Sequence, residues 1–190
     1  MLGDAAMQFI SIMTTVILAF IGYLVTYGNN VRLENRKAQA KFISDQLQNL
    51  YGPLFSLSHA SRTAWDSFRL RCRPGGGAFF DPESPPSEEE LEQWRLWMRA
   101  VFMPINLRME KAIIDNAHLI EGASMPKSFQ DLLAHVEVYK AILEKWSAGD
   151  VSEHTAYLNF PEALHGHVTR TFEALKQRQM ALIGHGPQTP

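Results

Sequence analysis

Two pairs of acidic and imidazole side chains are the residues of this 190-residue chain best suited to chemistry. Asp115 precedes His118 by three positions, and Glu162 precedes His165 by the same spacing. On a helix this spacing places a carboxylate and an imidazole one turn apart, as in the Glu-x-x-His pairs of helical di-metal proteins. Such centres also need a lone glutamate from each of two further helices. One pair here has Asp, and the neighbouring helix offers only Asp66, so a metal site is the minor alternative.

Nucleophilic and phosphate-binding chemistry have less support. Cys72 lies among arginines, which favour the thiolate, but the sequence offers it no identifiable histidine and amide partners. The glycines at 75–77 lack the Gly-Lys-Ser/Thr of a P-loop and do not lie between a strand and a helix, so they are typical of a flexible hinge. We therefore predict no catalytic residue, no cofactor and no enzymatic activity.

An uncharged, mostly apolar run extends from Ala5 to Tyr27. At about 1.5 Å per residue, a helix of this length can cross a hydrocarbon core of about 30 Å. A cleaved signal peptide would need a basic segment before the run and a small-residue cleavage site after it. Apart from the amino terminus nothing basic precedes the run, and Tyr23 and Tyr27 at its end are typical of a membrane interface. The sequence therefore predicts an uncleaved anchor within residues 1–27.

The charges that flank the run predict its orientation. Asp4 is the only charged side chain before it. Four basic residues follow closely and are expected to contact lipid headgroups: Arg32, Arg36, Lys37 and Lys41. By the positive-inside rule the N-terminus lies outside and the C-terminal domain lies in the cytoplasm.

The remaining chain predicts helices only. Residues 28–50 have a helical period and form a stalk that continues the anchor, and Gly52-Pro53 is expected to end it. Residues 51–184 form one domain, and 185–190 form a disordered tail. Within the domain helices are expected over 54–68, 87–119 with an interruption at Met103 before Pro104, 124–149 and 161–184, with a loop over 73–87. The predicted fold is all-α: a transmembrane helix, its stalk and an antiparallel cytoplasmic helical bundle.

A helix packed antiparallel to the stalk would return its C-terminal end to the lipid. That end carries Arg69, Arg71 and Arg73, followed by Phe79 and Phe80. We therefore predict that these arginines meet anionic headgroups and that the phenylalanines enter the interface. The alternative is that the arginines complement the helix dipole and the phenylalanines pack on the bundle.

Charge and aromatic content indicate which partners to expect. The chain has 18 basic and 20 acidic residues, a formal net charge of −2, which argues against general nucleic-acid binding. Trp97 falls off the apolar stripe of its helix and is predicted to be an exposed anchor for a protein partner. Ala19, Gly22 and Thr26 would also permit close approach of a second anchor helix, so self-association is possible.

The segment Leu50-Tyr51-Gly52-Pro53-Leu54 resembles a Leu/Phe-Tyr-x-Pro-Leu junction of uncharacterised bacterial proteins that have one N-terminal membrane helix and a helical cytoplasmic domain. The resemblance covers the anchor, the stalk and the start of the next helix. It implies a single-pass protein of the bacterial inner membrane and carries no assigned activity. Physically the segment is expected to form a corner, with Tyr51 and Leu54 packed at the turn.

The leading functional hypothesis is a scaffold or accessory protein, anchored in the lipid bilayer, whose helical domain binds another protein without catalysis. The competing hypothesis is a tethered bundle that binds a metal or small ligand, as a sensor or an oxidoreductase.

Overall fold

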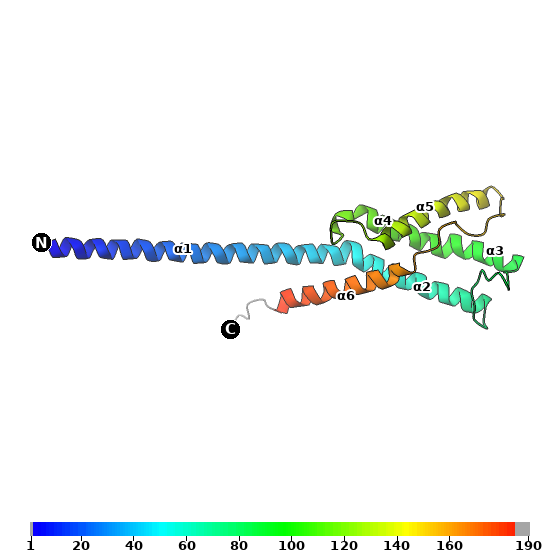
Figure 1. Ribbon diagram of the computed structural model, residues 1–190, viewed down its shortest axis with the longest axis horizontal. Coiled ribbons are helices and arrows are strands. Elements are labelled where there is room, and N and C mark those ends of the chain that lie inside the picture. The colour runs from blue at the N-terminus through cyan, green and yellow to red at the C-terminus, as the bar shows by residue number, and fades with distance from the viewer. Residues whose placement is uncertain (1, 185–190) are drawn as a thin grey trace.

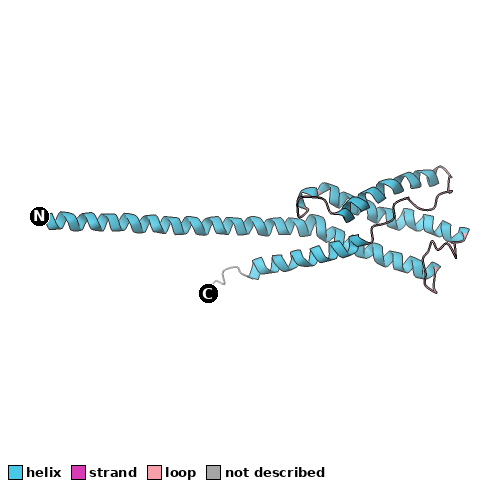
Figure 2. Cartoon of the chain, in the orientation of Figure 1, coloured by secondary structure: helices cyan, strands magenta, loops and turns pink. Residues whose placement is uncertain are grey.

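The structure is a computed structural model that describes residues 2–184, and the predicted tail 185–190 lies outside the described residues. The described chain is built from helices joined by loops and contains no strand, as Figure 2 shows. The predicted all-α class is therefore confirmed. The helices are α1 (Leu2–Asp45), the π-helix η1 (Gln46–Tyr51), α2 (Gly52–Cys72), α3 (Glu88–Trp97), the π-helix η2 (Met98–Phe102), α4 (Met103–Asp115), the 3-10 helix η3 (Ala117–Leu119), α5 (Lys127–Ser147) and α6 (Ala163–Gly184).

Helix α1 extends far beyond the rest of the molecule (Figure 1). Its apolar segment has a mean hydropathy of 1.6 in the most apolar window, and none of that window is buried within the protein. By length and composition it is the one helix in the described chain able to cross a membrane. The helix runs without interruption from the apolar segment into the predicted stalk.

The prediction that Gly52-Pro53 ends the stalk and turns the chain is wrong. Tyr51 and Gly52 both have right-handed helical dihedral angles, and the Gly52 N–H donates to the carbonyl of Leu47, five residues earlier. A proline inside a regular helix lacks one N–H, and its ring collides with the carbonyl four residues earlier. Widening the preceding turn to π geometry relieves that collision, so the chain continues as helix α2.

A side chain satisfies the carbonyl that Pro53 leaves without its usual donor. In a regular α-helix the Asn49 carbonyl would accept from the N–H of residue 53, which proline lacks. The Asn116 amide donates to it instead, with an Nδ2 to oxygen distance of 3.0 Å. Gln46, almost fully buried, donates from Nε2 to the Leu119 carbonyl at 2.8 Å. The π-helix η1 is therefore held by the segment that follows α4.

The same solution appears at the second helix-internal proline. The sequence predicts an interruption at Met103, but Met103 has helical dihedral angles: α3 ends at Trp97, and the π-helix η2 leads directly into α4. The Met103 N–H donates to the Met98 carbonyl, and Pro104 occupies the first turn of α4.

The start of α3 also agrees with prediction. Ser87 and Glu90 form both hydrogen bonds of a capping box. The preceding segment, 73–87, contains no regular element.

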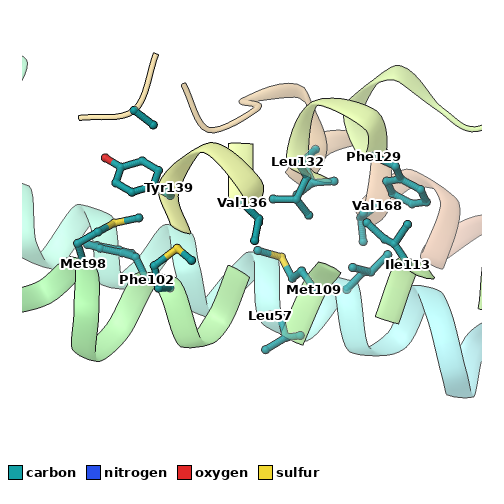
Figure 3. Packing of buried hydrophobic residues seen from close by; sticks show 14 of the residues in the cluster. Leu57, Met98, Phe102, Met109, Ile113, Phe129, Leu132, Val136, Tyr139 and Val168 are labelled. Atoms are coloured by element: carbon teal, nitrogen blue, oxygen red, sulfur yellow. The ribbon is translucent and has the colours of Figure 1, made fainter. Parts of the chain in front are cut away.

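The hydrophobic core lies where α2, α4, α5 and α6 meet. Figure 3 shows Met109 of α4 between Leu57 of α2 and Val136 of α5, and all three side chains are buried. Helix α6 then runs back along α2 towards α1. Its Phe172 stacks on Phe55 with ring centroids 4.4 Å apart. Further along α6, the Gln179 amide lies 3.3 Å from the Ser44 hydroxyl of α1. Helix α6 therefore contacts the chain on both sides of η1.

The linker 148–162 between α5 and α6 has no regular structure, yet ring nitrogens of the core hold its backbone. Trp94 Nε1 donates to the His154 carbonyl and Trp146 Nε1 to the Glu153 carbonyl, each at 2.7 Å. His135, only 3% exposed, lies with Nδ1 2.7 Å from the Leu158 carbonyl, so this nitrogen carries the proton and donates. Burial lowers the pKa of His135 below its usual 6.5, although the bond to Leu158 opposes the shift. The imidazole is therefore neutral in the folded protein.

Gly52→Ala tests the π-helix. A Cβ at this position would collide with the Leu47 carbonyl oxygen, so the turn must shift. We expect the variant to lose about 1–3 kcal/mol of unfolding free energy, measured by chemical denaturation in detergent micelles. Gly28→Ala is the matched control, because a Cβ there meets no atom within 4 Å, and it should change stability by less than about 1 kcal/mol. Equal stability of the two variants would contradict the π geometry.

Acidification should destabilise the domain through His135. Because its pKa is lower in the folded than in the unfolded state, the unfolded chain binds the proton first as pH falls below 6.5. The contribution of His135 to the free energy of unfolding should thus be constant above pH 6.5. It should decrease below this pH, until the pKa of the folded state is reached. His135→Asn keeps a donor for Leu158 but cannot titrate, so its melting temperature should decrease less between pH 7.5 and 5.5. The exposed His118→Asn serves as control, and a wild-type slope in the His135 variant would disprove the assignment.

Candidate functional site

The four residues of the possible metal site are not brought together. The Asp115 carboxylate binds Lys111 at 2.6 Å, and His118 and Glu162 are exposed. His165 lies on α6 and packs edge-on against His59 of α2, with ring centroids 4.4 Å apart. Within the described residues no group of three or more His, Cys, Asp or Glu side chains is arranged to hold a metal ion.

The histidines of α6 form part of the packing between helices. His165 Nδ1 lies 3.4 Å from the buried Ser58 hydroxyl, and His167 Nδ1 lies 2.7 Å from the Ser128 hydroxyl. Burial lowers the pKa of His165, and the neighbouring charges of His59 and Arg62 lower it further. The pKa of His167 is likewise lowered, first by burial. Both imidazoles are therefore neutral hydrogen-bonding partners at neutral pH.

The surroundings of the single cysteine do not activate its thiol as a nucleophile. Cys72 is half-buried, and burial raises its pKa, as does the nearby carboxylate of Glu90. A raised pKa leaves the thiol protonated at neutral pH, and only the thiolate is a strong nucleophile.

The membrane-contact prediction for Phe79 is wrong. Its side chain is 1% exposed and packs against Phe68, with ring centroids 5.0 Å apart, inside an aromatic cluster. Phe80, 36% exposed, packs edge-on against Phe79 and Trp94 and lies at the border of the same cluster. The members of this aromatic cluster are Trp65, Phe68, Phe79, Phe80, Trp94, Trp97 and Phe102. It holds the loop 73–87 against α2 and α3.

The predicted lipid contacts of Arg69, Arg71 and Arg73 are wrong as well. Arg73 pairs with Glu90 and donates to the Ser84 carbonyl at 3.3 Å, so it organises the loop. Arg69 and Arg71 occupy the last turn of α2, at the end of the molecule remote from α1 (Figure 1). Because the helix does not turn at Pro53, they lie about 60 Å along it from Tyr27, at about 1.5 Å per residue. The antiparallel return on which the prediction depended is absent.

Trp97 is not the exposed anchor that its position on the helix predicted. Its ring is half-buried and packs against Phe68 and Phe102, with centroids 5.4 and 6.1 Å away. Its neighbour Leu96 is 56% exposed instead. Trp97 follows the buried Trp94 by three positions, which places it beside the buried face of α3 and not opposite to it.

A groove lies over the first turns of α2, and we call it the α2 groove. It has a volume of about 600 Å³ and is open to solvent. Gly52, Ser56 and Ala60 contribute small side chains to its floor, and Phe172 of α6 and Arg108 of α4 contribute to its walls. Its lining is Leu47, Gln48, Gly52, Pro53, Ser56, Leu57, Ala60, Arg108 and Phe172.

Sequence reasoning did not find this groove. The four-residue spacing of Gly52, Ser56 and Ala60 was a usable signal for a shallow helix face. Arg108 and Phe172 reach the groove only through tertiary packing, which no local pattern encodes. The groove is an open surface whose lining includes one aromatic and one cationic side chain.

Comparisons with models of known protein families, with curated proteins and with solved structures find no match to this chain.

Phe79→Ala and Phe80→Ala form a matched pair for the role of the loop. Deleting the buried ring of Phe79 should cost about 3–5 kcal/mol of unfolding free energy, because it leaves a cavity in the aromatic cluster. Phe80→Ala should cost roughly half of that or less, since part of its ring is already in solvent. Denaturation in detergent micelles measures both. Equal losses, or a dependence of either loss on added anionic lipid, would favour the membrane-contact hypothesis.

Proposed function

We propose that this protein is a single-pass membrane protein whose helical domain binds another protein as a scaffold or accessory subunit, without catalysis of its own. The observation that supports it is the continuity of one helical path from an exposed apolar segment, through η1, into a packed domain with an open groove. Binding to a partner is the role that this combination suits best.

In this proposal α1 spans the bacterial inner membrane with its N-terminus outside. The rings of Tyr23 and Tyr27 stack with centroids 6.2 Å apart near the end of the apolar segment, as expected at an interface. Lys37 pairs with Glu34 and Lys41 with Asp45. The remaining basic residues of the flank, Arg32 and Arg36, have no ion pair among the described residues and are the side chains we assign to anionic headgroups. The positive-inside rule then places the domain in the cytoplasm.

The domain is suited to presenting a surface at a distance from the lipid. Residues 28–45 of α1 are mostly exposed helix, so they act as a spacer between the membrane and the core. In this proposal the packed helices beyond the spacer form an antiparallel bundle, in which α6, and not α2 as the sequence predicts, returns along the chain towards α1. The α2 groove lies next to η1, where the spacer enters the domain.

Gentle detergent extraction of the tagged full-length chain from its native membranes tests this function. We expect a protein partner to co-purify in stoichiometric amount and to be identified by mass spectrometry. A second copy of the chain alone would support the self-association form of the proposal. An unrelated tagged single-pass protein extracted in parallel controls for non-specific association. A monodisperse protein without partner, across several mild detergents, would contradict the proposal.

A further inference from the structure

We infer that the α2 groove binds an acidic segment of the partner protein. This inference rests on the proposed function and adds to it the site and the chemistry of the partner.

Charge is unevenly distributed over the helices although the chain as a whole carries −2. Helix α2 has three arginines and one aspartate, and α6 has Arg170, Lys176 and Arg178 with one glutamate. In contrast, α3 has four glutamates and one arginine, and the linker 148–162 has three acidic residues and no lysine or arginine. Arg69 and Arg71 lie in the last turn of α2, away from the groove, so the charge of the groove itself comes from Arg108, the one charged residue of its lining.

Arg108, which lines the groove and is exposed, has no ion-pair partner in the described part of the chain. No carboxylate oxygen of the described residues lies within 4.0 Å of its guanidinium nitrogens. Other exposed bases, such as Lys111 and Lys145, do pair with acids. An unpaired arginine in a groove attracts a complementary anionic group and can bind a carboxylate with two parallel hydrogen bonds.

The second wall supplies an apolar contact that is already ordered. Phe172 is half-buried, stacks on Phe55 at 4.4 Å and faces the low floor at Gly52. A wall held in place by packing loses little freedom when a ligand binds, which favours affinity. The matching segment therefore combines a carboxylate, directed at Arg108, with an apolar side chain against Phe172.

A second copy of this chain fits the groove less well. Copies anchored in one membrane present their α2 grooves at the same height, so basic surfaces would meet and repel. The acidic N-terminal turn of α3 lies at the end of the molecule remote from α1 (Figure 1), away from the level of the groove. The charge pattern therefore favours a different protein as the partner.

Site-specific photocrosslinking of the full-length protein in cells tests the inference. A photoreactive amino acid replaces Ser56 in the groove and, separately, the exposed Glu144 on α5 as an off-groove position. The crosslinked segment is identified by mass spectrometry. Each version is also combined with Arg108→Glu, or with Arg71→Glu, which makes the same charge change at the end of α2. Both arginines are exposed, so unchanged thermal unfolding should verify the fold of each variant.

We expect Ser56 to crosslink to a segment of another protein in which Asp and Glu outnumber Lys and Arg. Arg108→Glu should reduce the yield about tenfold, while Arg71→Glu should leave it within about twofold. Crosslinks at Ser56 to a second copy, or to a neutral or basic segment, would overturn the inference. So would an absence of Ser56 crosslinks when a partner co-purifies, and in that case the proposed function stands. If no partner co-purifies at all, the proposed function itself fails.

Discussion

The hydrogen bond from the Gly52 N–H to the Leu47 carbonyl is the interaction on which the arrangement of the molecule depends. It belongs to a π turn, and it lets the chain pass Pro53 without leaving helical geometry. As a result α2 continues in the general direction of α1, and the domain is assembled around the far part of one long helical path (Figure 1). Helix α6 contacts α1, η1 and α2 and so covers the irregular turn from outside. The groove beside η1 is a direct product of this arrangement, since Gly52 and Pro53 form part of its lining.

Much of the local structure was predictable because its causes are local. The Ser87–Glu90 capping box, the loop 73–87 and the irregularity before Pro104 follow from residue types at fixed spacings. The apolar character of α1 is likewise a property of composition. These features require no knowledge of which helices meet.

The direction of the chain after Gly52 and the contents of the candidate site were not predictable in this way. A proline is equally compatible with a turn and with a π turn, and the choice here is supported by the Asn116 amide, which bonds the Asn49 carbonyl from 67 residues away. The error in direction carried with it the errors for Arg69 and Arg71. Likewise Arg108 and Phe172 come together only after α4 and α6 have packed against α2. Trp97 was misplaced because the apolar stripe was drawn too narrowly, since a residue three positions after the buried Trp94 borders the same helix face.

The bonds that hold the linker 148–162 have a consequence for the order of folding. The linker depends on donors from α3 and α5, with Trp94 and His154 separated by 60 residues, and it has no regular structure of its own. Its backbone therefore becomes fixed only after α3 and α5 have docked, because contacts between distant residues require closure of the intervening loop. Helix α6 follows the linker and is also synthesised after all the other described helices. During synthesis the turn at η1 is consequently left uncovered. The nascent chain also exposes the ring of Phe55 until Phe172 of α6 packs against it.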